Sequence, residues 1–254
     1  IGGAGGEWRF AAGRLDLSES RFLVSDREAR DRFTPLMARG ASLAMVDGRI
    51  TADAVLRHPA SDIALAQIRI AHLLESGTGG ADFAVDGVTF APGLQPVDLS
   101  PLALGVVANV AGEVRGSGRI GWSTAGVTSN GSFTTDSLDL AAAFGPVQGA
   151  SGTVVFTDLL GMTTAPGQRV RIAAINPGIE VNDGEVSFSL TGGRLVQLES
   201  GIWPFMGVFV HALDADVADP YRLSNAGLGC QRHHAADVGI LRGEQVVARH
   251  GNMR

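Results

Sequence analysis

The 254-residue chain contains no lysine, so arginine supplies every side-chain cation except a protonated histidine. Lysine and arginine together number 20 against 26 acidic residues, which gives a formal net charge of −6. Charged residues make up 18% of the chain, below the quarter that is usual in globular proteins. An acidic chain without a basic stripe is poorly suited to nucleic acid, so we expect no nucleic-acid partner.

Cysteine and long apolar runs are also scarce. The single cysteine, Cys230, excludes an internal disulfide framework. The longest apolar stretch runs from Pro101 to Ala111 and is shorter than the roughly 20 residues that cross a bilayer. The chain begins at Ile1, without an initiator methionine or a signal peptide. We interpret it as a fragment of a longer protein.

The chain lacks the common catalytic motifs, namely the Gly-x-Ser-x-Gly elbow, the P-loop and the His-Glu-x-x-His pair. Asp158 could act as a general base, but no histidine lies in the same set of hairpins, and a turn-capping role is simpler. Cys230, His233 and His234 do not have the spacing of a structural zinc site. We therefore expect a protein that is not an enzyme, with no catalytic residue, no metal site and no cofactor.

Asp-Gly pairs flanked by alternating apolar residues are the strongest pattern present. Such pairs favour two-residue type I′ turns, in which both residues have positive φ. The pairs Asp47-Gly48, Asp86-Gly87 and Asp183-Gly184 each predict a hairpin with one apolar face. The predicted partners on these faces are Met45 with Ile50, Leu43 with Ala52, Ala41 with Ala54, Val85 with Val88, Phe83 with Phe90, Val181 with Val186, and Ile179 with Phe188.

The remaining segments up to about residue 210 also indicate strands and short turns. A turn at 124–126 would keep residues 127–135 on one long strand, and a phase slip near Gln67 predicts a bulge. Ser100 followed by Pro101 predicts the start of a short buried helix. Residues 26–38 predict a short helix or a crossing loop. The pattern amounts to roughly a dozen antiparallel strands with one apolar face and at most two helices.

The last part of the chain differs from the rest. Residues 211–254 hold four of the six histidines and the only cysteine, and their alternation fades. We therefore divide the chain into a β domain over residues 1–210 and an atypical tail over residues 211–254. A shifted reading frame or a disordered segment would explain this tail.

Several long, non-catalytic motifs occur along the chain, beginning at Asp47 (DGRITA), Thr89 (TFAPGLQP), Ala141 (AAAFGP), Phe156 (FTDLLG), Thr164 (TAPGQ), Ile175 (INPGIEV) and Trp203 (WPF). Together they resemble one family, the YdbH family of periplasmic proteins related to the AsmA and TamB group, once labelled a dicarboxylate-transport domain. The likeness spans about residues 10–207.

The resemblance implies an elongated, curved antiparallel sheet that forms a groove with an apolar interior. It further implies an N-terminal anchor in the inner membrane, a position in the periplasm, phospholipid transport between the two membranes and a small outer-membrane lipoprotein as partner. Acyl chains would lie on the face formed by Leu43, Met45, Ile50, Phe83, Val85, Val88, Phe90, Phe133, Ile179, Val181, Val186 and Phe188.

Two other functions remain open from the residues alone. A structural or scaffold β protein of the cell envelope would fill the same apolar face with an ordinary core. A dicarboxylate-binding protein would direct arginines inward, and the nearest candidates are Arg169, Arg171 and Arg194. Since Arg169 and Arg171 alternate with Val170 and Ile172, they are expected on the polar face.

Overall fold

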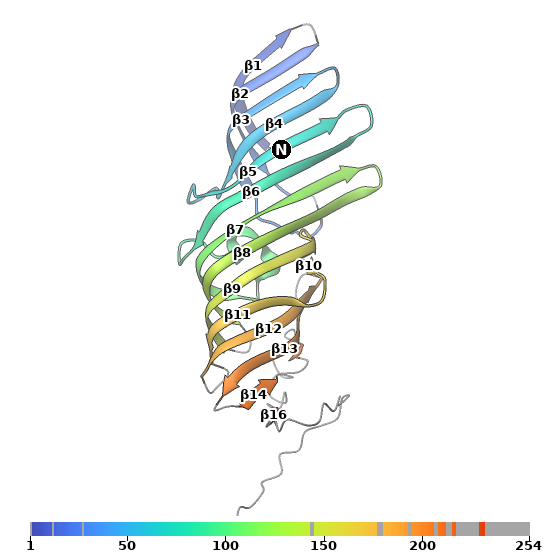
Figure 1. Ribbon diagram of the computed structural model, residues 1–254. Coiled ribbons are helices and arrows are strands. Elements are labelled where there is room, and N and C mark those ends of the chain that lie inside the picture. Colours follow the sequence, from blue (N-terminus) through green and yellow to red (C-terminus); the bar gives the residue numbers. More distant parts are fainter. Residues whose placement is uncertain are drawn as a thin grey trace, which may run out of the picture.

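The protein is mainly β, and its strands form one open antiparallel sheet (Figure 1). A computed structural model describes residues 2–11, 13–26, 28–142, 145–176, 180–192, 195–205, 208–211, 215–216 and 229–231. Apart from the two-residue strands β10 and β15, which pair with β9 and β13, strands that follow one another in sequence are neighbours in the sheet, so the chain zigzags along a single long axis. This confirms the predicted fold class.

The strands and helices occupy the following residues. The strands are β1 (Gly2–Ala11), β2 (Arg14–Val24), β3 (Leu36–Val46), β4 (Arg49–Arg57), β5 (Ala64–Leu73), β6 (Thr78–Phe90), β7 (Ala108–Ser123), β8 (Gly126–Ala142), β9 (Gly145–Asp158), β10 (Thr163–Thr164), β11 (Gln168–Ile175), β12 (Val181–Thr191), β13 (Leu195–Phe205), β14 (Val208–His211), β15 (Ala215–Asp216) and β16 (Gly229–Gln231). Between β6 and β7 lie the helix α1 (Pro96–Leu99) and the 3₁₀ turn η1 (Pro101–Ala103).

Two of the predicted turns join neighbouring strands. Asp47 and Gly48 have φ of 47° and 74°, and Val46 pairs with Arg49 on either side of them, as a type I′ turn requires. Ser123 pairs with Gly126, so the loop is Thr124-Ala125 and the long strand β8 forms as predicted. The local turn chemistry decided both connections.

The other two Asp-Gly pairs lie inside strands, and those turn predictions are wrong. Asp86-Gly87 interrupts β6 as a register shift between Val85 and Val88 against β7. Asp183 and Gly184 lie within β12, where Gly184 pairs with Ile172 of β11. Asp183 has a φ of 57°, so the residue adopts the left-handed conformation inside a strand whose register against β11 does not shift.

Three smaller expectations are also corrected or refined. The predicted Ala41–Ala54 pair does not form, because the register of β3 against β4 shifts between Arg39 and Ser42, beside Gly40 with its φ of 59°. The bulge in β5 lies beside the Leu56–Ala66 pair, just before Gln67. Ser100 caps η1 by accepting from the Leu102 N–H at 3.3 Å, but the helix ends after three residues and the chain continues into β7.

Register shifts bend the sheet along a line. In β6 to β9 they fall at adjacent positions of successive strands, from Asp86-Gly87 to the region of Gly149, and the positive φ of Asp183 in β12 lies in the same row without a register shift. Each extra residue increases the local twist and bends its strand, and Figure 1 shows the strands curving. The bend divides the sheet into a tip wall, which ends in the hairpin turns at 47–48, 74–77 and 124–125, and a base wall, which ends in the opposite connections at 25–35, 58–63 and 91–107.

Near the C-terminal end of the sheet, Glu199 of β13 is hydrogen-bonded both to the loop before β11 and to β12. Its Oε2 accepts from the Gly167 N–H at 2.8 Å and from the Ser187 hydroxyl at 3.0 Å. Burial raises the pKa of this carboxyl, but these hydrogen bonds outweigh it, and the net pKa is lower than usual.

Glu199→Gln is expected to reduce the free energy of unfolding by about 1 kcal/mol at pH 7, since a neutral amide accepts these bonds less strongly. A carboxyl whose pKa is lowered by folding stabilises the protein above its unfolded pKa and loses that contribution as pH falls through the folded pKa. Urea unfolding of both proteins should therefore show the difference at pH 7 and its disappearance below pH 4.5. A difference that persists unchanged in acid would contradict this assignment.

Candidate functional site: the apolar inner face of the sheet

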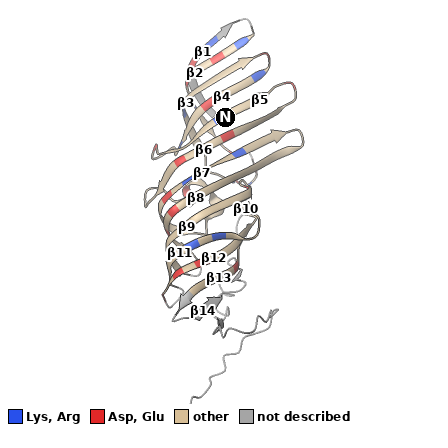
Figure 2. Cartoon of the chain, viewed as in Figure 1, with Lys and Arg blue, Asp and Glu red and all other residues tan. Residues whose placement is uncertain are grey.

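The two faces of the sheet differ in chemistry. The outer face carries the arginine–carboxylate pairs, including Arg69–Asp53 at 3.2 Å and Arg119–Asp82 at 3.0 Å. These pairs are exposed, and Figure 2 shows charges of both signs spread along the strands. Exposed pairs of this kind stabilise little. The opposite face, called the inner face here, is lined by apolar side chains and glycine.

Strand registry places apolar residues of successive strands side by side on the inner face. Met45 pairs with Ile50 and Leu43 with Ala52, Ala52 continues to Ile70 on β5, and Ile68 continues to Phe83 on β6. These larger side chains are half-buried. The alternation of each strand therefore adds up to one apolar surface that crosses the strands.

An aromatic row lies on a floor of glycine within this surface. Phe83 and Phe133 have ring centroids 6.4 Å apart, and Phe133 lies 5.9 Å from Phe156. Between Phe83 and Phe133 runs β7, whose inner residues Gly116 and Gly118 lie directly beneath the rings. A Cβ at Gly118 would lie 2.4 Å from Phe83 Cζ, and one at Gly116 would lie 2.6 Å from Phe133 Cδ1. The two glycines therefore let the rings lie flat against the backbone of β7.

A segment of the same chain covers part of the inner face. Residues 91–107, called the plug here, place Leu94, which is 1% exposed, against Leu65 and Val88. Val85 and Phe90 pack against the same cluster. The Gln95 side chain fixes the plug to β7 by donating to the Val110 carbonyl at 2.9 Å and accepting from its N–H at 2.8 Å.

The inner face is densely packed toward its C-terminal end. A buried cluster there includes Val147, Ile172, Val186 and Trp203. The Trp203 ring lies over Gly184 and Gly201, and a Cβ at either glycine would lie within 2.2 Å of a ring atom. This part of the sheet has a filled core rather than an open surface.

The predicted lining residues therefore separate into three groups. Half-buried residues on the open part are Leu43, Met45, Ile50, Phe83 and Phe133, while residues packed with the plug are Val85, Val88 and Phe90. Residues of the packed C-terminal part are Val181, Val186 and Phe188. Ile179 lies outside the described residues. Phe83, Val85, Val88 and Phe90 share the inner face as predicted, because the bulge at Asp86-Gly87 preserves the phase that the predicted turn would have given.

Sequence reasoning missed several residues of the inner face. Ile68, Ile70 and Phe156 belong to the open part by registry. The alternation of residues 63–73 indicated that Ile68 and Ile70 share one face of a strand. No turn residue in the sequence showed whether that face was the same as the apolar face of the neighbouring hairpins. Trp122 lies on the same face and its Nε1–H donates to His72 Nδ1 at 3.0 Å.

The polar candidates are placed outside this apolar surface or at its margin. Arg169 and Arg171 are exposed and lie on the outer face, as expected, and Arg169 lies 3.6 Å from Glu185. Asp158 accepts from the Gly161 N–H at 3.1 Å and from the Ser129 hydroxyl, which is the turn-capping role that the sequence favours. Arg194, His233, His234 and the side chain of Cys230 lie outside the described part of the chain.

Within the described residues, no three metal-binding side chains gather in one place, and no helix combines the length and apolarity that would cross a membrane.

Comparison with known proteins gives one match. A family model described as YdbH-like, intermembrane phospholipid transport protein YdbH, matches residues 3–208. No curated protein and no solved structure matches the chain.

Proposed function

The chain belongs to the YdbH-like family of intermembrane phospholipid transport proteins, and from this premise we propose that it carries phospholipid by holding acyl chains on the inner face of its sheet. It catalyses no reaction and acts as a bridge-like module between the inner and the outer membrane. The full-length protein is held in the inner membrane by an anchor outside this chain, lies in the periplasm and meets a small lipoprotein at the outer membrane.

The observation that carries this proposal is the continuous half-buried apolar surface from Leu43 on β3 to Phe156 on β9. Each methylene removed from water contributes about 0.8 kcal/mol, so ten methylenes of an acyl chain on this surface contribute roughly 8 kcal/mol by the same measure. No single polar contact is required, and binding of similar strength at each strand permits a lipid to slide along the sheet.

Mass spectrometry of lipids that remain with the purified chain tests this function, together with transfer of a fluorescent phospholipid between donor and acceptor vesicles. We expect bound phospholipid and transfer that depends on the protein. The scaffold alternative, which the packed C-terminal cluster supports locally, predicts neither. Binding of a dicarboxylate with no bound lipid would instead favour a solute-binding protein, and serum albumin serves as the control for unspecific uptake of lipid.

A further inference from the structure

The β2–β3 connection forms a closed loop held by a nearly buried ion pair. The Arg32 guanidinium binds both carboxylate oxygens of Asp26, with Nε to Oδ2 at 2.8 Å and the second contact at 2.9 Å. The Arg32 N–H also donates to Oδ2 at 2.9 Å. The Asp26 side chain is 3% exposed. A bidentate pair of this kind fixes geometry as well as charge, so residues 28–34, called the strap here, have a defined shape.

The strap is fastened to the plug. The Ser100 hydroxyl donates to the Arg32 carbonyl at 2.6 Å, and the Thr34 N–H donates to the Leu99 carbonyl at 2.9 Å. These bonds join residues more than 60 positions apart in the sequence. Because the plug itself packs on Leu65 and Val88 of the base wall, the strap is seated on that wall through the plug.

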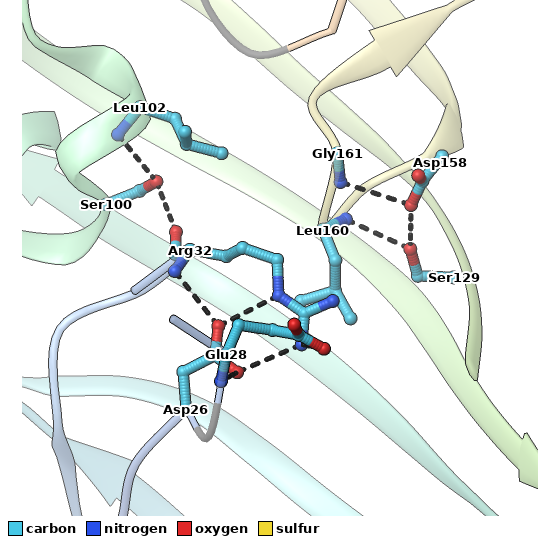
Figure 3. A network of polar contacts seen from close by, with 9 residues as sticks. All are labelled: Asp26, Glu28, Arg32, Ser100, Leu102, Ser129, Asp158, Leu160 and Gly161. Carbon is cyan, nitrogen blue, oxygen red and sulfur yellow. Dashed lines mark hydrogen bonds and ion pairs between the residues drawn. The ribbon is translucent and has the colours of Figure 1, made fainter. Parts of the chain in front are cut away.

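The free side of the strap faces the opposite wall. Asp158 and Leu160 belong to the turn after β9, at the tip wall, and the charge of Asp158 contributes to raising the pKa of Arg32 after the larger effect of Asp26. Figure 3 shows the Leu160 side chain directed toward Arg32, with the Asp158–Ser129 network on one side and the Ser100–Asp26 network on the other. The strap therefore extends from the base wall to the tip wall across the inner face.

We propose that the strap is a latch over the apolar inner face, which controls the entry of phospholipid acyl chains onto the surface beneath it. This rests on the proposed function and adds a moving part to it. The Asp26–Arg32 pair and the two bonds to the plug keep the latch closed. When these contacts break, the strap leaves both the plug and the turn at Leu160 and uncovers the region between the aromatic row and the plug.

Two variants of the full chain test the latch in opposite directions. Arg32→Ala leaves the Asp26 carboxylate without its guanidinium, which a nearly buried charge tolerates poorly, and should free the strap. Thr34→Cys with Leu99→Cys, in a Cys230→Ser background, should hold it, because the Thr34 N–H already donates to the Leu99 carbonyl and a disulfide at this contact would join the strap covalently to the plug. Arg69→Ala, which removes an exposed outer-face pair, is the matched arginine control.

The measurement is the rate of uptake of a fluorescent phospholipid from vesicles of phosphatidylethanolamine and phosphatidylglycerol. We expect Arg32→Ala to load about tenfold faster than wild type, which corresponds to 1.4 kcal/mol, and Arg69→Ala to match wild type. The oxidised cysteine variant should load slowly and recover on reduction. Amide exchange at Thr34 shows whether the strap is released in Arg32→Ala.

The outcomes distinguish a failure of the latch from a failure of the proposed function. Equal uptake by the oxidised and reduced cysteine variant, with uptake by wild type intact, overturns the latch and leaves lipid transport standing. Faster exchange at Thr34 without faster loading also overturns it. No uptake by wild type removes the proposed function, and the latch with it.

Discussion

Gly184→Ala is expected to reduce the free energy of unfolding by about 3 kcal/mol, the upper part of the range for overpacked cores. A Cβ at this position would lie 1.9 Å from Trp203 Nε1, and Trp203 is 5% exposed. The indole also rests on Gly201 and packs in the buried C-terminal cluster, so moving it away from Gly184 disturbs that packing. Equilibrium unfolding in urea, followed by circular dichroism, measures the loss.

Two further variants identify the cause. Gly93→Ala is the control, because a Cβ there meets nothing within 4 Å, and it should leave stability unchanged within about 0.5 kcal/mol. Trp203→Ala alone should cost about 3–5 kcal/mol. The double variant Gly184→Ala with Trp203→Ala should lose about 2 kcal/mol less than the sum of the two single-variant losses, because the clash between the new Cβ and the indole is gone. If the two single-variant losses simply add, glycine is required at position 184 for its backbone conformation and not to make room for the indole.

Phe83→Arg is expected to remove most bound phospholipid while the sheet stays folded. The ring is half-buried on the open part of the inner face, between Ile68 and Gly118. An arginine there can turn its guanidinium to water when no lipid is present, but an acyl chain would have to desolvate it. We expect lipid content to fall about tenfold or more, equivalent to at least 1.4 kcal/mol, with an unchanged circular dichroism spectrum.

Val186→Arg separates an open surface from a packed core. Val186 is 5% exposed within the C-terminal cluster, and a charge buried there without a partner destabilises strongly. This variant should lose its cooperative unfolding transition, whereas Phe83→Arg should retain it. If both variants unfold, the inner face is a filled core along its whole length and the scaffold function gains support. If Phe83→Arg keeps its lipid, acyl chains lie elsewhere.

The apolar surface could be predicted from the sequence to the extent that it depends on alternation. Phe83, Val85, Val88 and Phe90 share a face whether Asp86-Gly87 is a turn or a bulge, since both insert two residues between matching phases. Whether a given Asp-Gly pair forms a hairpin turn could not be predicted in the same way. Asp47 and Asp183 both have positive φ, at 47° and 57°, yet Asp47 lies in a hairpin turn and Asp183 lies inside a strand.

Local sequence determined the strand periodicity, the apolar face and the two-residue turns at Asp47-Gly48 and Thr124-Ala125, because these depend on neighbouring residues and on the fixed period of a strand. Its long motifs also indicated the family. Only the tertiary structure decided which part of the apolar face is open and which is covered. Leu94 reaches Leu65 and Ser100 reaches Arg32, and contacts between residues so far apart along the chain depend on the bend of the whole sheet, which no local pattern specifies.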